Sequence, residues 1–287
     1  ITVSTLAVSS DSGIYLSETD DVTVTTVDAV AVDIESVVRV NFNSTTTDVS
    51  ADQAIASLED LSTTTDGPIK LVSESGSITV EGGSDDQGVS AAGSGDVLLE
   101  ARGVASDLVI NAEVVSGTGN ITLDAGNDLA VNASVATGGT GTLYLASGNN
   151  TTVASQLTSA SGDLLIESVG DISQSAAITS TSGDVGLIAG VALTQTTNGD
   201  IDTDGDVLLE AGSDWTMAGD AVVSATGNVV GRALGGDLGL GVISGTNVAL
   251  AASNSILDAN AGLLNVTADN LSLRADSGLI GGSDTGN

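Results

Sequence analysis

The sequence predicts an all-β protein, a right-handed parallel β-helix (solenoid) with about 22 residues per coil and one short helical excursion. Three observations support this fold class. A glycine-anchored phrase recurs at a nearly constant spacing, short alternating strands follow each anchor, and proline, which would interrupt a strand ladder, occurs once, at Pro68. Residues 1–287 are expected to form a single domain, one unit of a longer array or fibre.

The repeat is clearest between residues 94 and 235. The phrase SGDVLLEARG (94–103) returns as TGNITLDAGN (118–127) and SGDLLIESVG (161–170), and in weaker forms between and after them. The anchoring glycines are Gly95, Gly119, Gly141, Gly162, Gly183, Gly205 and Gly227. The positions of successive anchors differ by 24, 22, 21, 21, 22 and 22, a period typical of one solenoid coil.

Each repeat opens with a strand whose alternate residues are apolar, such as Val97 and Leu99. Most repeats contain a second strand that begins with a polar residue, as in DLVINAEV (107–114) and DLAVNASV (128–135), and small polar residues fill the turns. Because no helical periodicity separates the strands, each coil is expected to pair with the coils before and after it, roughly 4.8 Å away. The right hand follows from the preference of parallel crossover connections.

The composition excludes several classes of function. Five basic and 38 acidic residues give a net charge of −33, so the chain lacks the basic patches that bind nucleic-acid phosphates. No apolar run reaches the length of a membrane-spanning helix, so no membrane insertion is expected. Hydrophobic residues make up 41% of the chain but aromatic residues only 1%, which indicates a narrow core of stacked aliphatic side chains rather than a disordered acidic chain.

The aspartates of the stretch NGDIDTDGDVLLEAG (198–212) raise the question of a metal site. Its DxDxDG opening resembles a helix–loop–helix calcium loop, but the twelfth position is Ala211 instead of Glu. The nonapeptide calcium repeat is also absent, and GGSDDQ (82–87) comes nearest to it. The stretch is therefore interpreted as a turn in which Asp side chains bind backbone N–H groups.

Stacked coils would align these corner residues into columns. The first column contains Asp96, Asn120, Thr142, Asp163, Asp184, Asp206 and Asn228. A second contains Asp107, Asp128, Asp171, Asp214 and Asp237. Like charges at the coil spacing repel each other, so the alternative to solvated turns is a bound Ca²⁺. Its ligands would be Asp163, Asp184 and Asp206, with Asp202 and Asp204. No other cofactor is expected.

The segment 33–66 breaks the repeat. Within SADQAIASLEDL (50–61), Ser50 and Gln53 form a capping-box pattern, and Ala54, Ile55, Leu58 and Leu61 are spaced as one apolar helical face, which predicts a short helix. The excursion is interpreted as a lid over a strand edge, or alternatively as a lateral contact or recognition element. The residues expected to make that contact are Arg39, Phe42, Ile55 and Leu58.

The sequence favours a protein that is not an enzyme. His and Cys are absent, and no glycine-rich phosphate loop with its lysine occurs. Many β-helical proteins cut polysaccharides, so a polysaccharide-processing enzyme is kept as a minor alternative. Sugar-cutting clefts stack sugar rings on aromatic residues, whereas this chain has four, and its five basic residues are scattered.

The repeats SGDVLLEARG, TGNITLDAGN and SGDLLIESVG, with second strands of the DLAVNASV type, resemble the β-strand repeats of giant bacterial surface and secreted adhesins, such as the filamentous-haemagglutinin-like β-helix proteins. The resemblance covers roughly residues 68–287 and, more loosely, 1–32. It implies a bacterial protein, extracellular or on the cell surface, that supplies reach, adhesion or fibre structure. It brings no catalytic residues.

The two ends of the chain contain a matching phrase, LSLRADSGLI (271–280) and LAVSSDSGIY (6–15). With a second copy placed after Asn287, Gly278 and the next Gly13 would be separated by one internal period of the repeat. Head-to-tail stacking or tandem copies are therefore expected to continue the coil. The residues expected at this junction are Leu271, Leu273, Leu279, Ile280, Ile1, Val3, Leu6 and Val8.

These observations favour a structural, non-catalytic extracellular protein that forms a rod or fibre by end-to-end continuation of the β-helix. The alternative is an adhesin module that binds a surface glycan or another host ligand through the 33–66 excursion. Loss of rods on removing the excursion would favour the first function, and loss of binding with intact rods would favour the second.

Overall fold

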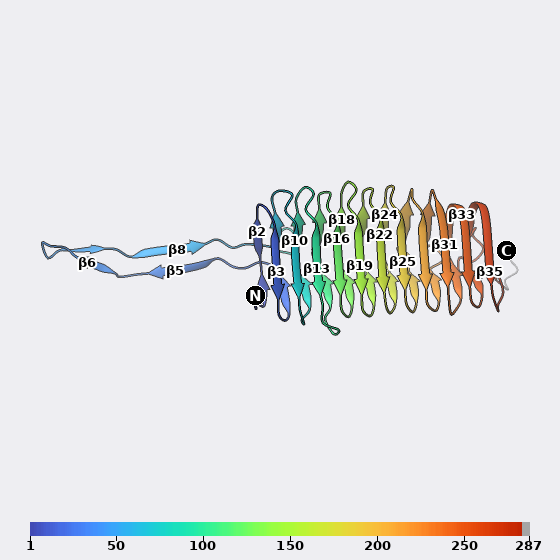
Figure 1. The fold of residues 1–287 in the computed structure, drawn as a ribbon, viewed down its shortest axis with the longest axis horizontal. Coiled ribbons are helices and arrows are strands. Elements are labelled where there is room, and N and C mark those ends of the chain that lie inside the picture. Colours follow the sequence, from blue (N-terminus) through green and yellow to red (C-terminus); the bar gives the residue numbers. More distant parts are fainter. Residues whose placement is uncertain (283–287) are drawn as a thin grey trace.

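In the computed structural model, which describes residues 1–282, the chain forms one β-solenoid, and an antiparallel ribbon projects from its N-terminal end along the long axis (Figure 1). Strands β2 (Val8–Ser10) and β35 (Val266–Ala275) lie at opposite ends of the solenoid. The strands of the solenoid pair in parallel, coil upon coil. The predicted parallel β-helix and the predicted period of its coils are confirmed. Strand pairing does not distinguish the two hands, so the right-handed winding stays a prediction.

Each coil has three faces, because the predicted second strand of the repeat turns a corner in its middle. The segment 107–114, for example, gives β14 (Leu108–Ile110) on one face and β15 (Glu113–Ser116) on the next, with Asn111 and Ala112 at the corner. The first face is an 11-stranded parallel sheet, which gives the solenoid eleven coils with a strand on this face. The other two faces join in a 20-stranded sheet.

The strands of the first face are β1 (Thr5–Leu6), β4 (Val22–Val24), β11 (Ile78–Val80), β14, β17 (Leu129–Val131), β20 (Thr151–Val153), β23 (Ile172–Gln174), β26 (Leu193–Gln195), β29 (Trp215–Met217), β32 (Leu238–Leu240) and β34 (Ile256–Asp258). Those of the second are β2 (Val8–Ser10), β9 (Leu61–Thr63), β12 (Gln87–Ala91), β15, β18 (Val135–Thr137), β21 (Leu157–Ser159), β24 (Ile178–Ser180), β27 (Ile201–Thr203) and β30 (Val222–Ala225). Those of the third are β3 (Ile14–Glu18), β10 (Ile69–Ser73), β13 (Val97–Ala101), β16 (Ile121–Ala125), β19 (Leu143–Ser147), β22 (Leu164–Ser168), β25 (Val185–Ala189), β28 (Val207–Ala211) and β31 (Asn228–Ala233). The last two coils merge the second and third faces in β33 (Val242–Ala252) and β35 (Val266–Ala275).

In the solenoid, alternate residues of the strands point into a narrow aliphatic core. In β13 the buried residues are Val97, Leu99 and Ala101, and they stack in register on Ile121, Leu123 and Ala125 of β16. Most of the interior consists of such columns of Val, Leu, Ile and Ala. The predicted aliphatic core and its alternating strands are therefore confirmed.

The anchoring glycines allow the coils to pack closely at one corner. A Cβ added to Gly162 would lie 2.1 Å from the carbonyl oxygen of Gly141 in the coil before it, and Gly183 meets Gly162 in the same way. The same carbonyls accept hydrogen bonds from buried hydroxyl groups, as Ser180 Oγ donates to Gly162 O at 3.0 Å. The column therefore needs a residue without a side chain, which explains the Gly repeat.

Residues 28–57 leave the second coil and form the ribbon. Strand β5 (Val30–Ile34) pairs antiparallel with β8 (Ala51–Ile55), and β6 (Val38–Val40) pairs with β7 (Thr46–Asp48). The helix predicted within 50–61 is wrong. Ser50 Oγ instead donates to Asp48 and accepts from the Val37 N–H, and all five residues of β8 pair with β5. Cross-strand pairing therefore overrides the local capping pattern, and Leu61 enters the core in β9.

Candidate functional site

The ribbon is the largest departure from the solenoid. Its base is closed by an antiparallel bridge between Val27 and Leu58, whose backbone groups exchange hydrogen bonds of 2.8 and 3.0 Å. All residues of its four strands are exposed. Because a two-stranded ribbon is marginally stable in water, an exposed ribbon of this length is typical of a segment that contacts a partner.

The inner half of the ribbon has one apolar face. Val30, Val32 and Ile34 of β5 point to the same side and lie opposite Ile55, Gln53 and Ala51 of β8. The other face places Asp33 directly opposite Asp52, a pairing of like charges that weakens the ribbon. The inner half of the ribbon therefore presents a mainly apolar face to solvent.

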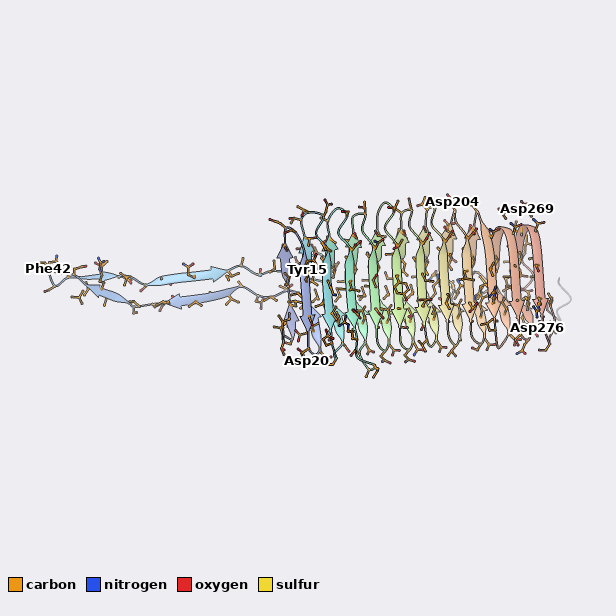
Figure 2. The ribbon with its side chains drawn as sticks, in the orientation of Figure 1. Tyr15, Asp20, Phe42, Asp204, Asp269 and Asp276 are labelled. Atoms are coloured by element: carbon orange, nitrogen blue, oxygen red, sulfur yellow. The ribbon has the colours of Figure 1, made fainter. Side chains whose placement is uncertain are left out.

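The tip of the ribbon is a compact polar turn that carries the chain's single phenylalanine. Asn41 Nδ2 donates to the hydroxyls of Thr45 and Thr47 at 3.1 and 2.8 Å, and Asn43 Oδ1 accepts from the Thr45 hydroxyl at 2.7 Å. Phe42 lies at the far end of the ribbon, fully exposed (Figure 2). The turn therefore holds an aromatic side chain in solvent.

The four residues predicted to form a lateral contact do not gather into one patch. Phe42 is at the tip, and Arg39 lies in β6 opposite Thr47. Ile55 is on the apolar face of the inner half, and Leu58 is at the base. They are distributed along the whole length of the ribbon, so a contact through all of them would have to cover it from end to end.

The C-terminal end of the solenoid is apolar. A recess of about 250 Å³ opens beside β34 and β35. Its lining includes the predicted junction residues Leu271, Leu273 and Ile280. Leu271, Leu279 and Ile280 are each about half exposed, whereas Leu273 packs against the core. Residues 283–287, which follow the phrase LSLRADSGLI (271–280), lie outside the described residues.

The N-terminal end is protected more strongly. Leu6 is buried and Val8 packs against the core, while Ile1 and Val3 are exposed. Strands β1 and β2 have two and three residues, and Glu18 points inward at the end of β3 with its Oε1 buried and unpartnered. Short edge strands and inward charges discourage edge pairing.

The register of the two ends corrects one prediction. Gly13 precedes β3 on the third face, whereas Gly278 precedes Ile280, which bridges Ile256 of β34 on the first face. Leu6 and Leu271 likewise lie on different faces. The matching phrases therefore occupy different corners of the coil, and the one-period separation of Gly278 from the next Gly13 does not continue the register.

The two predicted columns of corner residues are confirmed, and their geometry explains the acidity. Asp163 Oδ1 accepts the Asp184 N–H at 2.9 Å, and Asp184 Oδ1 accepts the Asp206 N–H at 2.8 Å. In the second column, Asp171 and Asp214 accept the N–H groups of Ala192 and Asp237. Each carboxylate thus binds a corner N–H of the next coil, as an N-cap does in a helix.

The predicted calcium ligands occupy several distinct places at this corner. Asp163, Asp184 and Asp206 form the column, Asp204 accepts the Thr226 hydroxyl at 2.7 Å, and Asp202 lies within β27 on the second face. Within residues 1–282, the group of three carboxylates whose oxygens come close enough to share a metal ion is elsewhere: Glu59, Asp60 and Asp85. Calcium at the column stays a prediction.

A shallow groove of about 740 Å³ runs beside this column. Leu165, Leu208 and Val230 are among its apolar lining residues, and Asp163, Asp184 and Asp206 also line it. Arg232 also lines it and forms an ion pair with Glu210 at 3.5 Å. None of the lining residues is aromatic. The groove therefore lacks the stacking platforms on which sugar-binding clefts rely.

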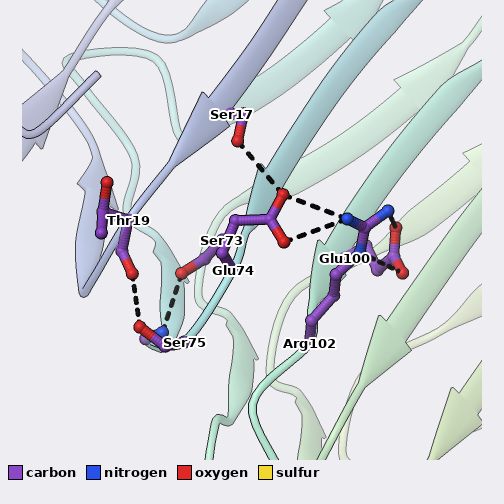
Figure 3. A network of polar contacts seen from close by, with 8 residues as sticks. Ser17, Thr19, Ser73, Glu74, Ser75, Glu100 and Arg102 are labelled. Carbon is purple, nitrogen blue, oxygen red and sulfur yellow. Dashed lines mark hydrogen bonds and ion pairs between the residues drawn. The ribbon is translucent and has the colours of Figure 1, made fainter.

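A polar network ties the first coils together on the third face (Figure 3). Arg102 donates to Glu74 at 3.0 and 3.1 Å and to Glu100 at 2.9 and 3.2 Å, and Ser17 Oγ donates to Glu74 at 3.3 Å. The hydrogen bonds that Arg102 donates to Glu100 and Glu74 raise the pKa of its guanidinium group. The network links three successive coils next to the ribbon.

Comparison with protein-family models, curated proteins and solved structures finds no match to this chain. The likeness to β-helix repeat proteins therefore rests on the repeat and on the solenoid itself. In the described part of the chain, no helix has the length and apolar character needed to cross a membrane.

Proposed function

We propose that the chain is a structural, non-catalytic unit of an extracellular bacterial rod or fibre in which copies meet end to end. The proposal is supported by two apolar surfaces that lie at opposite ends of the same solenoid. The recess beside β34 and β35 is at one end, and the apolar face of the ribbon extends beyond the other. Two unlike surfaces at opposite ends give a contact that propagates instead of closing.

The ribbon sets the geometry of this contact. At about 3.3 Å per residue, arms of about 12 residues reach roughly 40 Å, which spans several coils of a neighbouring copy. A neighbour whose C-terminal end faces β1 would therefore have the ribbon along its flank. The ribbon's apolar face would be covered there, and the contact would not require the continuous coil register that Gly13 and Gly278 lack.

The bridge at the base of the ribbon allows a clean test. Because Val27 and Leu58 already pair, replacing residues 28–57 by Asn-Gly should close a two-residue hairpin without disturbing β4 or β9. We expect the shortened chain to fold and to remain monomeric at concentrations where the full chain forms rods, as judged by sedimentation velocity and negative-stain microscopy. Leu271→Asp should have the same effect from the other end.

Matched controls separate assembly from folding. Asp33→Asn alters the opposite face of the ribbon, so rods should persist, and the fluorescence of the buried Trp215 reports on the solenoid in every variant. If the full chain is monomeric at high concentration, or if the shortened chain forms rods equally well, the end-to-end proposal is wrong.

An adhesin function is the second candidate, and the exposed Phe42 on its hydrogen-bonded turn favours it. Aromatic side chains are common anchors in recognition surfaces. Under this alternative, Phe42→Ala should abolish binding of labelled protein to cultured host cells and leave rods unchanged. Under the structural proposal, by contrast, removing residues 28–57 abolishes the rods, and the full chain does not bind to the cells.

The non-catalytic part of the proposal rests on the groove and on the residue types available. No aromatic side chain lines the groove, and His and Cys are absent from the sequence. Incubation of the purified chain with an acidic polysaccharide should leave the polymer's size distribution unchanged. Depolymerisation would favour the enzyme alternative.

A further inference from the structure

Three carboxylates meet at the base of the ribbon. Glu59 and Asp60 follow the returning arm, directly after Leu58 and before β9. Asp85 comes from the next coil, in the loop between β11 and β12. One carboxylate oxygen from each residue lies within 4.8 Å of the other two. Opposite oxygens around a calcium ion, each roughly 2.3–2.6 Å from the metal, are about 4.6–5.2 Å apart, so this spacing fits one coordination sphere.

Asp60 is the member that points to a ligand. Asp60 is only 8% exposed, and its Oδ1 atom is buried without a hydrogen-bond partner. A buried carboxylate oxygen without a hydrogen bond is costly, because the ionised form has lost its water there. Burial, followed by the charges of Asp85 and Glu59, raises the pKa of Asp60 to about 6, against the backbone N–H of Gly83, which lowers it.

The other two carboxylates are held in place by the loop. Glu59 Oε2 accepts the Ser84 N–H at 2.8 Å and the Ser84 hydroxyl at 3.0 Å, and Asp85 Oδ1 accepts the Gln87 N–H at 3.2 Å. Gly83 makes room for Glu59, since a Cβ there would lie 2.3 Å from Oε2. In the part of the chain that the structure describes, none of the three forms an ion pair with Lys or Arg.

We propose that Glu59, Asp60 and Asp85 bind a hard divalent cation of the size of calcium, which ties the base of the ribbon to the following coil. Hard cations of this size prefer carboxylate oxygens, and the cation would supply the positive charge that these three residues lack. Because Glu59 and Asp60 follow the ribbon and Asp85 belongs to the solenoid, the bound ion would fix the base of the ribbon. The inference does not depend on fibre formation.

The test compares Asp60→Asn with Asp184→Asn in the full chain. After treatment with chelator, added calcium should raise the melting temperature of the wild type and of Asp184→Asn, but leave Asp60→Asn unchanged. In chelator alone, Asp60→Asn should melt at or above the wild-type temperature, because it removes a buried negative charge that no cation balances. Titration calorimetry should show loss of calcium binding in Asp60→Asn, and magnesium should give a smaller shift than calcium.

Hydrogen exchange locates the ion. Calcium should slow amide exchange in residues 58–62 and 82–88 and leave 163–206 unchanged. The proposal is overturned if calcium changes neither melting nor exchange in the wild type, if the response persists in Asp60→Asn, or if Asp184→Asn alone removes it. The last outcome would assign the ion to the corner column. A magnesium response equal to that of calcium would overturn the assignment to an ion of calcium's size.

Discussion

Strand β5 of the ribbon and strand β13 of the solenoid have nearly the same sequence pattern, VAVDI and VLLEA, but different environments. Alternate residues of β13 are buried, and every residue of β5 is exposed. Strand β13 has a parallel neighbour on each side and two further faces of its coil behind it. Strand β5 has one antiparallel neighbour and nothing behind it. Alternating apolar residues thus favour a strand in both regions. Only a strand that belongs to a stacked coil buries its apolar side.

The largest expected effect comes from a matched pair of substitutions that shorten one apolar side chain in each region. Leu145→Ala should lower the free energy of unfolding by about 2–5 kcal/mol, because it leaves a cavity in a close-packed column. Val32→Ala on the ribbon should change it by less than about 0.5 kcal/mol. Urea unfolding followed by Trp215 fluorescence and circular dichroism measures both. Equal effects would mean that the ribbon is covered by the solenoid in solution.

The anchoring glycines give the next largest effect. Gly162→Ala places a Cβ 2.1 Å from a backbone oxygen, so it should destabilise the solenoid by about 1–3 kcal/mol. Gly239→Ala is the control, since its Cβ would have no neighbour nearer than 3.9 Å. The control should be neutral or slightly stabilising in the same urea experiment. Similar losses for both variants would contradict close packing as the reason for the glycine column.

The corner carboxylates should matter less. Asp184→Ala removes the acceptor for the Asp206 N–H and should cost about 1 kcal/mol, as loss of an N-cap does. Asp184→Asn keeps an acceptor oxygen and should be near neutral, as Asn120 and Asn150 hold equivalent positions. The melting temperatures of the two variants give the comparison. A larger loss for Asn than for Ala would show that the charge, not the acceptor, is needed.

The smallest effect concerns a side-chain hydrogen bond between two successive coils of the solenoid. Tyr144 Oη donates to Glu167 at 2.8 Å, and this bond, with burial and the carboxylate charges, raises the pKa of Tyr144 to about 12. The phenol holds its proton more tightly in the folded state, so its stabilising effect is full below about pH 10 and is lost between pH 10 and 12. In a Tyr15→Phe background, absorbance at alkaline pH should show Glu167→Gln lowering this pKa. An unchanged titration would mean that the bond does not form in solution.

The parts of the fold that repeat were predictable from the sequence. Gly162, Asp163 and Leu164 recur at one corner in coil after coil, so seven imperfect copies define the period, the inward residues and the acidic columns. The third face was missed, because the corner at Asn111 and Ala112 is too short to interrupt the apolar pattern.

The parts that occur once were not predictable in the same way. Ser50 and Gln53 carry a true capping pattern, but the partner that overrides it is β5, on the outgoing arm of the ribbon and far outside the helical window. Gly13 and Gly278 look alike because a glycine precedes a strand at more than one corner of a coil. The proposed cation site was not predicted because Glu59 and Asp60 are brought close to Asp85 of the next coil only by the fold, although GGSDDQ (82–87) was the nearest match to a calcium motif.

The stacked acidic corners also give the molecule the charge density of a polyelectrolyte. Eleven coils at about 4.8 Å form a rod roughly 50 Å long, which carries most of the chain's net charge of −33. That is one charge per roughly 2 Å of axis, comparable to about 1.7 Å for double-stranded DNA. A rod of this kind retains a cloud of condensed counterions. Its association with any basic partner would release those ions and weaken steeply as the salt concentration rises.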